Sequence, residues 1–412
     1  MTKSTAARQI DLFEHVAGAY AQPQSGRLTN AELYRMAVGR AGVDPKLLNE
    51  TAPVGRAGDQ RSLLKRAIRW HQQTLRSLGL IERVEGERAV WELTEAGKKK
   101  MRTVKDNIAA IAFSTDLGLA IWGNCHHVFS KWDEPIFLAL TSTPYPLQKP
   151  RAYGNPPVED FIDFISRVVE PIANKLVPGG NILLSLSNDV HLPKSPARSL
   201  YFEKLTIALC ERFGLYKMDT LIWESNKAPG PIQWASLQRM QFNTAYEPIL
   251  WLCNDPVRCI ANNQRVLEPH TEQHQKLIDQ GGVKHVAVNG DGVYRLRPGS
   301  YGNPTAGRIP RNVLHVPNNC ASQRAYKKRA REIGLQPHGA PMPLALARKL
   351  IRFMTDVDQL VVDPCAGSMT TALASELEGR RWAATDVVYD YVRGAAERFR
   401  QFEGFDLALD AA

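Results

Sequence analysis

The chain has 412 residues, of which 44% are hydrophobic, and this length predicts two or three folded domains. Its formal net charge of +10 favours a polyanionic partner, above all nucleic acid, over a neutral ligand. The six cysteines lack metal-ligand spacing, and no run approaches the roughly 18 apolar residues that a membrane span requires. We therefore expect no metal site, no disulfide framework and no span, in a protein of a reducing cytoplasm.

The N-terminal part predicts a flexible segment followed by a small helical domain. Residues 1–26 are expected to be flexible and to end in the turn-rich stretch "QPQSG". Thr29 or Asn30 is then placed to cap a helix, and residues 59–80 predict a second helix with many arginines and lysines. The apolar face expected for this second helix comprises Leu63, Ala67, Trp70, Leu75 and Leu78.

A hairpin completes this domain. The residues on both sides of Glu85–Gly86 alternate between apolar and polar, as is typical of two strands joined by a turn. Helices followed by such a hairpin predict a winged helix-turn-helix domain over residues 27–103. These domains often place a basic helix in the major groove of DNA, and the same fold also docks proteins. The sequence leaves both uses open.

Beyond the basic stretch "GKKKMRTVK", strands and helices alternate over residues 104–405, which predicts a doubly wound, mostly parallel α/β sheet. A polar stretch of about residues 255–310 interrupts the pattern. The strands are expected within residues 135–140, 179–187, 216–225, 245–254, 359–367 and 380–386, and the helices within residues 158–176, 197–214, 340–354 and 368–378.

A loop of small residues, Asp363–Ser368, connects one of these strands to the next helix. Small residues let the backbone approach a ligand closely, in the crevice where α/β proteins usually bind ligands. The loop is neither a dinucleotide fingerprint nor a phosphate-binding P-loop, because no lysine follows Gly367. Asp386 ends the following strand, where its carboxylate could accept hydrogen bonds from two ribose hydroxyls. Together these features predict a site for a nucleoside-containing ligand.

Several motifs resemble those of DNA amino-methyltransferases. "DPCAGSMTT" resembles the D-P-F-x-G-S-G-T-T loop that binds S-adenosylmethionine in that family, and "TSTPY" resembles its S-P-P-Y catalytic motif. The catalytic motif comes first, as in the beta class. "PYPLQKPRAYGN", "KAPGPIQW", "GRIPRNVLHV" and "QPHGAPMPLALARKLI" are similar to segments of the PvuII-type modification enzymes, and the resemblance covers roughly residues 118–400.

The resemblance implies a Rossmann-like methyltransferase fold with a mostly parallel sheet of seven strands. It also implies S-adenosylmethionine as cofactor and double-stranded DNA as partner, in a bacterial cytoplasm or nucleoid. It places a target-recognition region at about residues 225–310. The cofactor-binding residues that it implies are Asp363, Pro364, Cys365, Ala366, Gly367, Ser368, Thr370 and Asp386, with His338, Gly339 and Pro341 around the methionine half.

The resemblance assigns catalysis to Ser142, Thr143, Pro144 and Tyr145. An exocyclic amine is a poor nucleophile because its lone pair is delocalised into the ring, so acceptors must hold its two hydrogens and stabilise the charge that develops. The Ser142 hydroxyl and the Thr143 carbonyl would be these acceptors. Pro144 would stiffen the loop, and Tyr145 would stack on a base flipped out of the duplex.

Thr143 departs from the proline at the second position of the family motif. Its carbonyl keeps the acceptor, so the loss is one of rigidity, and the following Pro144 already favours an extended backbone at this position. In this family a leading serine is associated with cytosine N4 and a leading aspartate or asparagine with adenine N6. Both side chains act here only as acceptors, so the sequence leaves the target base open.

DNA contacts are expected from polar and basic residues near the catalytic loop and in the recognition region. These residues are Lys149, Arg151, Asn226, Lys227, Gln233, Arg239, Arg308 and Arg311. A homodimer is plausible from the N-terminal domain and the basic linker. An RNA or protein amide methyltransferase, or a non-catalytic DNA-binding regulator on this fold, are the alternative functions.

Overall fold

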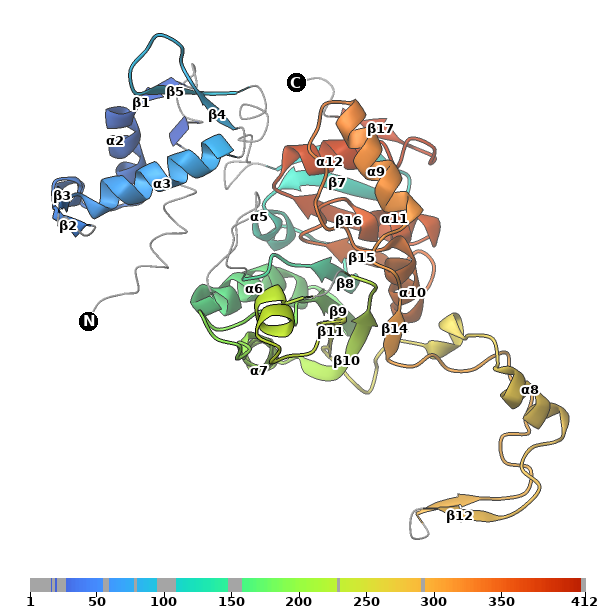
Figure 1. Ribbon diagram of the computed structural model, residues 1–412. Coiled ribbons are helices and arrows are strands. Elements are labelled where there is room, and N and C mark those ends of the chain that lie inside the picture. The colour runs from blue at the N-terminus through green and yellow to red at the C-terminus, as the bar shows by residue number, and fades with distance from the viewer. Residues whose placement is uncertain are drawn as a thin grey trace.

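The computed structural model describes residues 16, 19–20, 27–54, 59–77, 80–94, 109–146, 158–227, 230–289 and 293–408. They form a small N-terminal unit that extends to Thr94 and a large α/β domain that begins at Ala109 (Figure 1). The Lys- and Arg-rich linker "GKKKMRTVK" lies outside the described residues.

The N-terminal unit contains the two helices and the hairpin that the sequence predicts. Thr29 caps its first helix: the backbone N–H of Glu32 donates to Thr29 Oγ1 (3.2 Å), and the N–H of Thr29 donates to the Glu32 carboxylate (2.8 Å). The order of elements is that of a winged helix, and this assignment stays a prediction. The elements are β1 (Arg27–Thr29), α2 (Asn30–Arg40), η1 (Pro45–Leu48), β2 (Ala52–Val54), β3 (Asp59–Arg61), α3 (Leu63–Ser77), β4 (Ile81–Arg83) and β5 (Val90–Leu93), with a sheet in the order β1-β5-β4.

The face that α3 buries differs in part from the expected one: Leu75 is buried and Ala67 packs against the core, as predicted, whereas Leu63 and Trp70 do not. Leu63 and Trp70 are 58% and 57% exposed, and the residues that enter the core are Ile68, His71, Gln72 and Leu75. Gln72 is stable there because its amide donates to the hydroxyl of Tyr20 (2.7 Å). Helical periodicity alone could not find this partner, which lies 52 residues away in the chain. Leu78 lies outside the described residues.

The same core corrects the expectation of a flexible segment over residues 1–26. Val16, Ala19 and Tyr20 are fully buried and pack with Leu33 and Ile68. For these three residues the expectation is wrong, because their apolar surface completes a core that α2 and α3 alone leave uncovered.

The large domain is built on one mostly parallel sheet, as predicted, but the described residues give it ten strands instead of seven. Its order is β14-β10-β11-β9-β8-β15-β16-β7-β6-β17, and only β6 and β11 run against the other eight. The strands are β6 (Ala109–Thr115), β7 (Gly118–Gly123), β8 (Ile136–Ser142), β9 (Leu176–Ser185), β10 (Tyr216–Glu224), β11 (Tyr246–Cys253), β14 (Val313–His315), β15 (Leu360–Asp363), β16 (Arg381–Asp386) and β17 (Asp406–Leu407).

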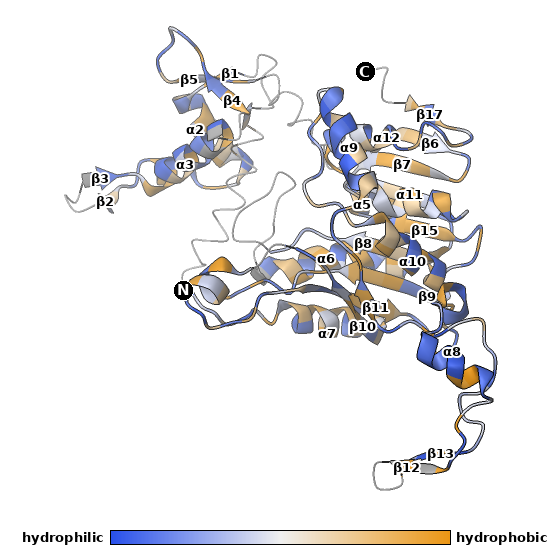
Figure 2. Cartoon of the chain, turned by 45° about the vertical axis from the view of Figure 1, so that its right-hand side comes forward, coloured by the Kyte–Doolittle hydropathy of each residue, from blue (hydrophilic) through white to orange (hydrophobic). Residues whose placement is uncertain are grey.

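Helices cover both faces of this sheet, because the central strands are apolar on both sides. In β9, Ile182 and Leu184 face the cluster made with α6 and α7, and Leu183 faces the cluster made with α10. The sheet strands are accordingly hydrophobic in Figure 2, whereas α8 and α9 are largely hydrophilic. The helices are α5 (Cys125–Ser130), α6 (Val158–Ala173), α7 (Tyr201–Phe213), α8 (Glu272–Asp279), α9 (Ala321–Glu332), α10 (Leu344–Met354), α11 (Thr370–Leu377) and α12 (Tyr389–Ala396).

A projecting arm leaves the body beyond Glu268, which pairs with Arg308 through reciprocal backbone hydrogen bonds and an ion pair of 2.8 Å. The arm carries α8 and the short hairpin β12 (Ala287–Asn289) and β13 (Tyr294–Leu296), and it extends away from the sheet (Figures 1 and 2). None of the helices in the described residues is both long and apolar enough to cross a membrane.

Candidate active site

The site lies where parallel strands end at one edge of the sheet. β8, β15, β16 and β7 are neighbours and run in the same direction, so the loops at their carboxyl ends meet. A cavity of ≈ 730 Å³ opens there. Eight of the predicted site residues line it: Ser142, Thr143, Pro144, Tyr145, His338, Pro364, Cys365 and Asp386. The tertiary structure therefore brings together motifs that the chain separates by some two hundred residues.

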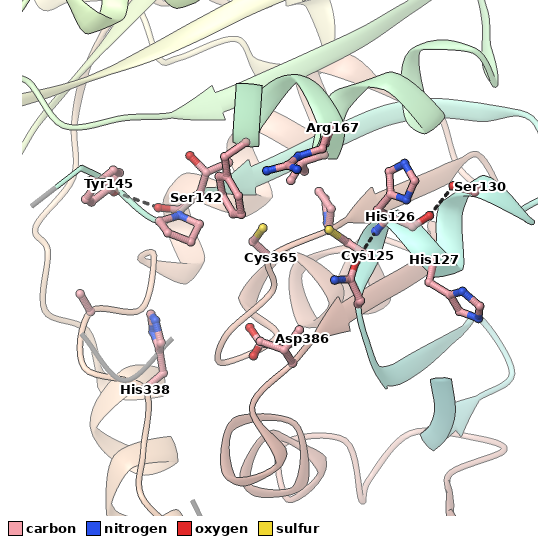
Figure 3. A pocket seen from close by; sticks show the side chains of 18 of the residues that line it. Cys125, His126, His127, Ser130, Ser142, Tyr145, Arg167, His338, Cys365 and Asp386 are labelled. Atoms are coloured by element: carbon pink, nitrogen blue, oxygen red, sulfur yellow. Dashed lines mark hydrogen bonds between the residues drawn. The ribbon is translucent and has the colours of Figure 1, made fainter. Parts of the chain in front are cut away.

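The catalytic loop begins at the last residue of β8. The hydroxyls of Ser142 and Tyr145 are joined by a hydrogen bond of 2.9 Å, which holds the serine side chain at the cavity (Figure 3). Thr143 is 1% exposed, and its buried position fixes the backbone between them. Ser142 also pairs in register with Ser185 of β9, so the loop starts from a hydrogen-bonded strand end.

The loop after β15 is shaped by its own backbone hydrogen bonds. Asp363 accepts from the N–H of Cys365 (3.1 Å), and the N–H of Ala366 donates to the carbonyl of Thr385 (2.9 Å). Gly367 has φ = +50°, and a Cβ there would lie 3.2 Å from the ring of His338. Glycine is therefore required both by the backbone conformation and by the side chain packed against it.

Asp386 faces the cavity from the end of β16 (Figure 3). One carboxylate oxygen accepts from the N–H of Gly367 (2.8 Å) and the other from the N–H of Val388 (2.8 Å). Each oxygen retains a lone pair for a ligand. Burial raises the pKa of Asp386 to about 6, and burial also raises the pKa of Asp363 to about 6.

Other predicted cofactor residues lie behind the cavity wall. Asp363, Ser368 and Thr370 are buried at the base of the loop. The guanidinium of Arg398 donates to the carbonyl of Ser368 (2.6 Å) and to the hydroxyl of Thr370 (3.2 Å). These residues hold the loop from below, and Ala366, also buried, packs in the cluster beneath it.

The segment around His338 covers the loop from the other side. The N–H of His338 donates to the hydroxyl of Tyr326 (2.9 Å), and its ring packs edge-on against Tyr391 at 5.0 Å. The carbonyls of Gly339 and Pro341 accept from Lys327 (2.9 Å) and Gln323 (2.6 Å). The predicted residues Gly339 and Pro341 are thus fixed beside the cavity, where Ala340 forms part of the lining.

Two thiols enter the cavity. Cys365 and Cys125 both line it, and their sulfur atoms point into the same space in Figure 3. Hydrogen bonding with Cys125 and burial raise the pKa of Cys365 well above its ordinary value. The raised pKa keeps the Cys365 thiol protonated, which makes it a poor nucleophile.

The sequence did not single out one wall of the cavity. The strand β7 runs parallel to β16 and delivers its carboxyl end beside Asp386, and α6 closes the opposite side. The apolar stretch "GLAIWG" before Asn124 is the sequence feature that could have predicted strand β7. The residues added to the lining are Asn124, Cys125, His126, His127, Ser130, Lys131, Phe164, Arg167, Val168, Ala340 and Val387.

The predicted DNA contacts that the structure describes lie in two places. Asn226, Lys227, Gln233 and Arg239 follow β10, whose carboxyl end lies at the same edge of the sheet as Ser142. Lys227 pairs with Glu247 at 3.7 Å, whereas Gln233 and Arg239 are exposed.

Two further arginines lie away from the catalytic cavity. Arg308 and Arg311 line a separate cavity of ≈ 330 Å³, together with Glu268 and Lys349. Arg308 is ion-paired with Glu268 there. The remaining two predicted contacts, Lys149 and Arg151, lie outside the described residues.

Comparison with known proteins identifies the family of the chain. Residues 136–397 match the family model described as DNA methylase. The chain is 27% identical to the type II methyltransferase M.PvuII of Proteus hauseri over 70% of its own length and 85% of the relative. It is 21% identical to the type II methyltransferase M.ScaI of Streptomyces caespitosus, over 76% and 94% of the two chains.

A solved structure shares the fold. The cytosine-N4-specific PvuII DNA methyltransferase superposes with a TM-score of 0.53 and 24% identity, over 69% of this chain and 87% of that one. Because the family model spans more than half of the chain and includes both the catalytic loop and the cofactor loop, the protein belongs to the DNA methylase family, the N6-adenine and N4-cytosine amino-methyltransferases.

Proposed function

We propose that the chain methylates the N4 amino group of cytosine in duplex DNA, on a base that is flipped into the cavity at the edge of the sheet. One observation carries this proposal: Ser142, Thr143 and Tyr145 face the loop after β15 and Asp386 across a single cavity. A donor bound on one wall and a base bound on the other would meet in that space.

The cavity fits S-adenosylmethionine, the methyl donor of this family. Its ≈ 730 Å³ lies within the range of roughly 300–1,000 Å³ typical of small-molecule sites. Gly367 lets the His338 ring pack against the loop as part of the cavity wall, since a side chain at this position would displace that ring. Asp386 offers carboxylate lone pairs toward the cavity, which suit ribose hydroxyls. When bound, the donor supplies an electrophilic sulfonium methyl group.

The chain's own residues would orient the amine. Ser142 and Thr143 both line the cavity. The Ser142 hydroxyl and the Thr143 carbonyl would accept hydrogen bonds from the two N–H groups, and these hydrogen bonds would strengthen as the nitrogen gains positive charge. Burial of Thr143 and the fixed φ of Pro144 keep the two acceptors in one arrangement, which supplies positioning without reorganisation. Tyr145 lies three residues beyond Ser142 and would stack on the flipped base.

Two facts favour cytosine over adenine. The first position of the catalytic motif is Ser142, the residue associated with cytosine N4 in this family. The solved structure that shares the fold is a cytosine-N4-specific enzyme, and the type II methyltransferase M.PvuII is also 27% identical to this chain. The two alternatives outside DNA methylation, an RNA or protein amide methyltransferase and a non-catalytic regulator, gain no support from the family that the chain matches.

The DNA side of the site would comprise the segment after β10 and the projecting arm, with the N-terminal unit as an accessory contact. Residues 225–310 include Gln233 and Arg239, whose exposed side chains suit base edges and phosphates. Sequence-specific recognition by this region, the winged-helix domain and a homodimer remain predictions.

The proposal is tested by incubating the full chain with radiolabelled S-adenosylmethionine and duplex DNA, RNA or protein. We expect label in DNA, and digestion to nucleosides should place it in N4-methylcytosine. Label in N6-methyladenine would overturn the choice of base, and absence of label from every duplex, random sequences included, would overturn the function.

Ser142→Ala tests the catalytic role. We expect kcat to fall by about a hundredfold or more, because one acceptor for the developing charge is lost, with little change in S-adenosylmethionine affinity measured by calorimetry. Ser185→Ala, at the end of the neighbouring strand, is the control for a lost strand-end hydroxyl. A Ser142→Ala variant with wild-type kcat would refute the assigned role.

A further inference from the structure

The segment between β10 and β11 exposes an apolar cluster that the core does not use. This cluster comprises Ile232 (66% exposed), Leu237 (66%), Met240 (63%) and Phe242 (95%). Scattered exposed apolar side chains are normal, but a group of large ones within eleven consecutive residues marks an interaction surface. Phe242 is the extreme case, since almost its whole ring is in solvent.

The position of this cluster ties it to the catalytic edge. β10 and β8 run in the same direction, so the segment after β10 leaves the same edge as Ser142. Ser142 is paired in register with Ser185, and the loop that follows Ser185 therefore starts beside the catalytic loop. That loop in turn holds the segment, because Gln241 donates to the carbonyl of Pro196 (2.6 Å). The loop after β9 therefore begins beside Ser142 and contacts the segment of the apolar cluster at Gln241.

Phe242 is presented from an anchored backbone. On one side, the Gln241 amide is held by Pro196 and its carbonyl oxygen lies 3.2 Å from the ring of His191. On the other side, the hydroxyl of Thr244 accepts from Arg198 (2.9 Å), and the N–H of Thr244 donates to the carbonyl of Gly230 (2.7 Å). These hydrogen bonds hold the backbone on both sides of Phe242 at the surface.

The charge of the segment suits DNA. Between Ser225 and Ala245 the sequence contains two basic residues, Lys227 and Arg239, and no acidic residue. Arg239 is exposed and lies three residues from Phe242. Lys227 is paired with Glu247, so Arg239 is the exposed positive charge of this segment. An apolar side chain near an exposed arginine is suited to a stack of bases flanked by phosphates, whereas a second apolar protein surface would not require the arginine.

We propose that Phe242 inserts into the base stack of the duplex next to the target base and fills the space that the flipped base leaves. Flipping costs a few kcal/mol of pairing and stacking, and an inserted apolar side chain offsets part of this cost by restoring contacts with the neighbouring bases. This inference rests on the proposed DNA methylation, and it adds the residue that replaces the flipped base within the stack.

The test compares paired and unpaired target bases. Wild-type chain first methylates a plasmid of known sequence, and the modified positions define the site. A short duplex with one such site is then made in two forms, one with the target base normally paired and one with it opposite an abasic position. We expect Phe242→Ala to lower kcat/KM on the paired duplex by about ten- to a hundredfold and to stay within about threefold of wild type on the abasic form.

Matched variants separate insertion from general damage. Phe242→Leu keeps an apolar side chain and should retain most activity, and Tyr216→Ala removes a 55% exposed aromatic residue at the opposite end of β10 and should behave as wild type. Ser142→Ala should be slow on both duplexes, because its defect lies in chemistry.

Three results would overturn the proposal: equal activity of Phe242→Ala and wild type on the paired duplex, an equal loss on both duplexes, or a change of oligomeric state in sedimentation, which would assign the cluster to a second copy of the chain. Failure of the wild type to methylate the plasmid would instead reject the proposed function itself.

Discussion

The loop after β15 and the segment after β10 leave the same edge of the sheet, yet they are built in opposite ways. The first is largely buried, and residues outside the loop satisfy its backbone polar groups. The N–H of Gly367 donates to Asp386, and the carbonyl of Ser368 accepts from Arg398. The second is held only at its flanks and exposes Phe242 and Arg239. A small ligand of fixed shape requires a preformed wall, whereas a duplex that must be opened requires groups still free to contact it. The predictions below test this contrast.

Gly367→Val should have the largest effect. The residue has φ = +50°, where a β-branched side chain is strained, and a Cβ would meet the His338 ring at 3.2 Å. We expect S-adenosylmethionine affinity to fall by about a hundredfold or more in calorimetry, while binding of duplex DNA in a mobility-shift assay is retained. Gly334→Val, at a helix end with open space and a similar φ, controls for backbone strain alone. If the two variants bind S-adenosylmethionine equally well, the close packing of His338 on Gly367 does not contribute to binding of the donor.

Asp386→Asn should have the next largest effect, because an amide is a weaker acceptor than a carboxylate. We expect the KM for S-adenosylmethionine to rise by about tenfold to a hundredfold, with a smaller change in kcat. Asp390→Asn, on the adjacent helix α12, serves as a control carboxyl outside the lining of the cavity. An unchanged KM would remove Asp386 from the donor site.

The same carboxyl predicts a pH dependence. Its pKa is raised to about 6, so protonation as the pH falls through 6 removes the acceptor, and the KM of the wild type should rise on the acid side. Because the folded state holds this proton more tightly than the unfolded chain, the contribution of Asp386 to stability decreases as the pH rises from its ordinary pKa of about 3.9 through 6. Asp386→Asn should abolish the KM change. Persistence of the change in the variant would assign it to another group, such as Asp363.

Arg398→Met should act on stability more than on chemistry. The guanidinium holds the Ser368 carbonyl and the Ser322 hydroxyl from beneath the loop, and a thioether leaves both without that donor. We expect the free energy of unfolding to fall by about 2 kcal/mol in denaturant titration, with S-adenosylmethionine restoring part of it by binding the folded state. Arg400→Met, an exposed neighbour on the same turn, is the control. Equal stabilities of the two variants would contradict the support role.

Tyr294→Ser, on the projecting arm, should have the smallest effect. The side chain is 69% exposed, so its removal should change the free energy of unfolding by less than about 0.5 kcal/mol. The same change should weaken binding of duplex DNA if the arm contacts the nucleic acid. A loss of stability comparable to that of Arg398→Met would show that the projecting arm, like the loop after β15, contributes to the stability of the fold, which would contradict the contrast.

The amino-acid sequence by itself determined the alternation of strands and helices and the positions of the two loops for which we propose cofactor binding and catalysis. These features are local: buried parallel strands are continuous apolar runs, and small residues or prolines at their ends define the loops. The core face of α3 could not be predicted in this way, because Gln72 is buried through a bond to Tyr20, and Tyr20 itself belongs to a segment without a clear pattern.

Only the tertiary structure decided which residues share the cavity. Asn124, Phe164 and Arg167 carry no motif, and they reach the site because β7 lies beside β16 and α6 packs across the end of β8. Strand order is set by packing between segments distant in the chain, which a single sequence does not display. For the same reason Phe242 is an ordinary aromatic residue in the sequence, and only its anchored flanks and its open surroundings identify it as a surface group held out for a partner.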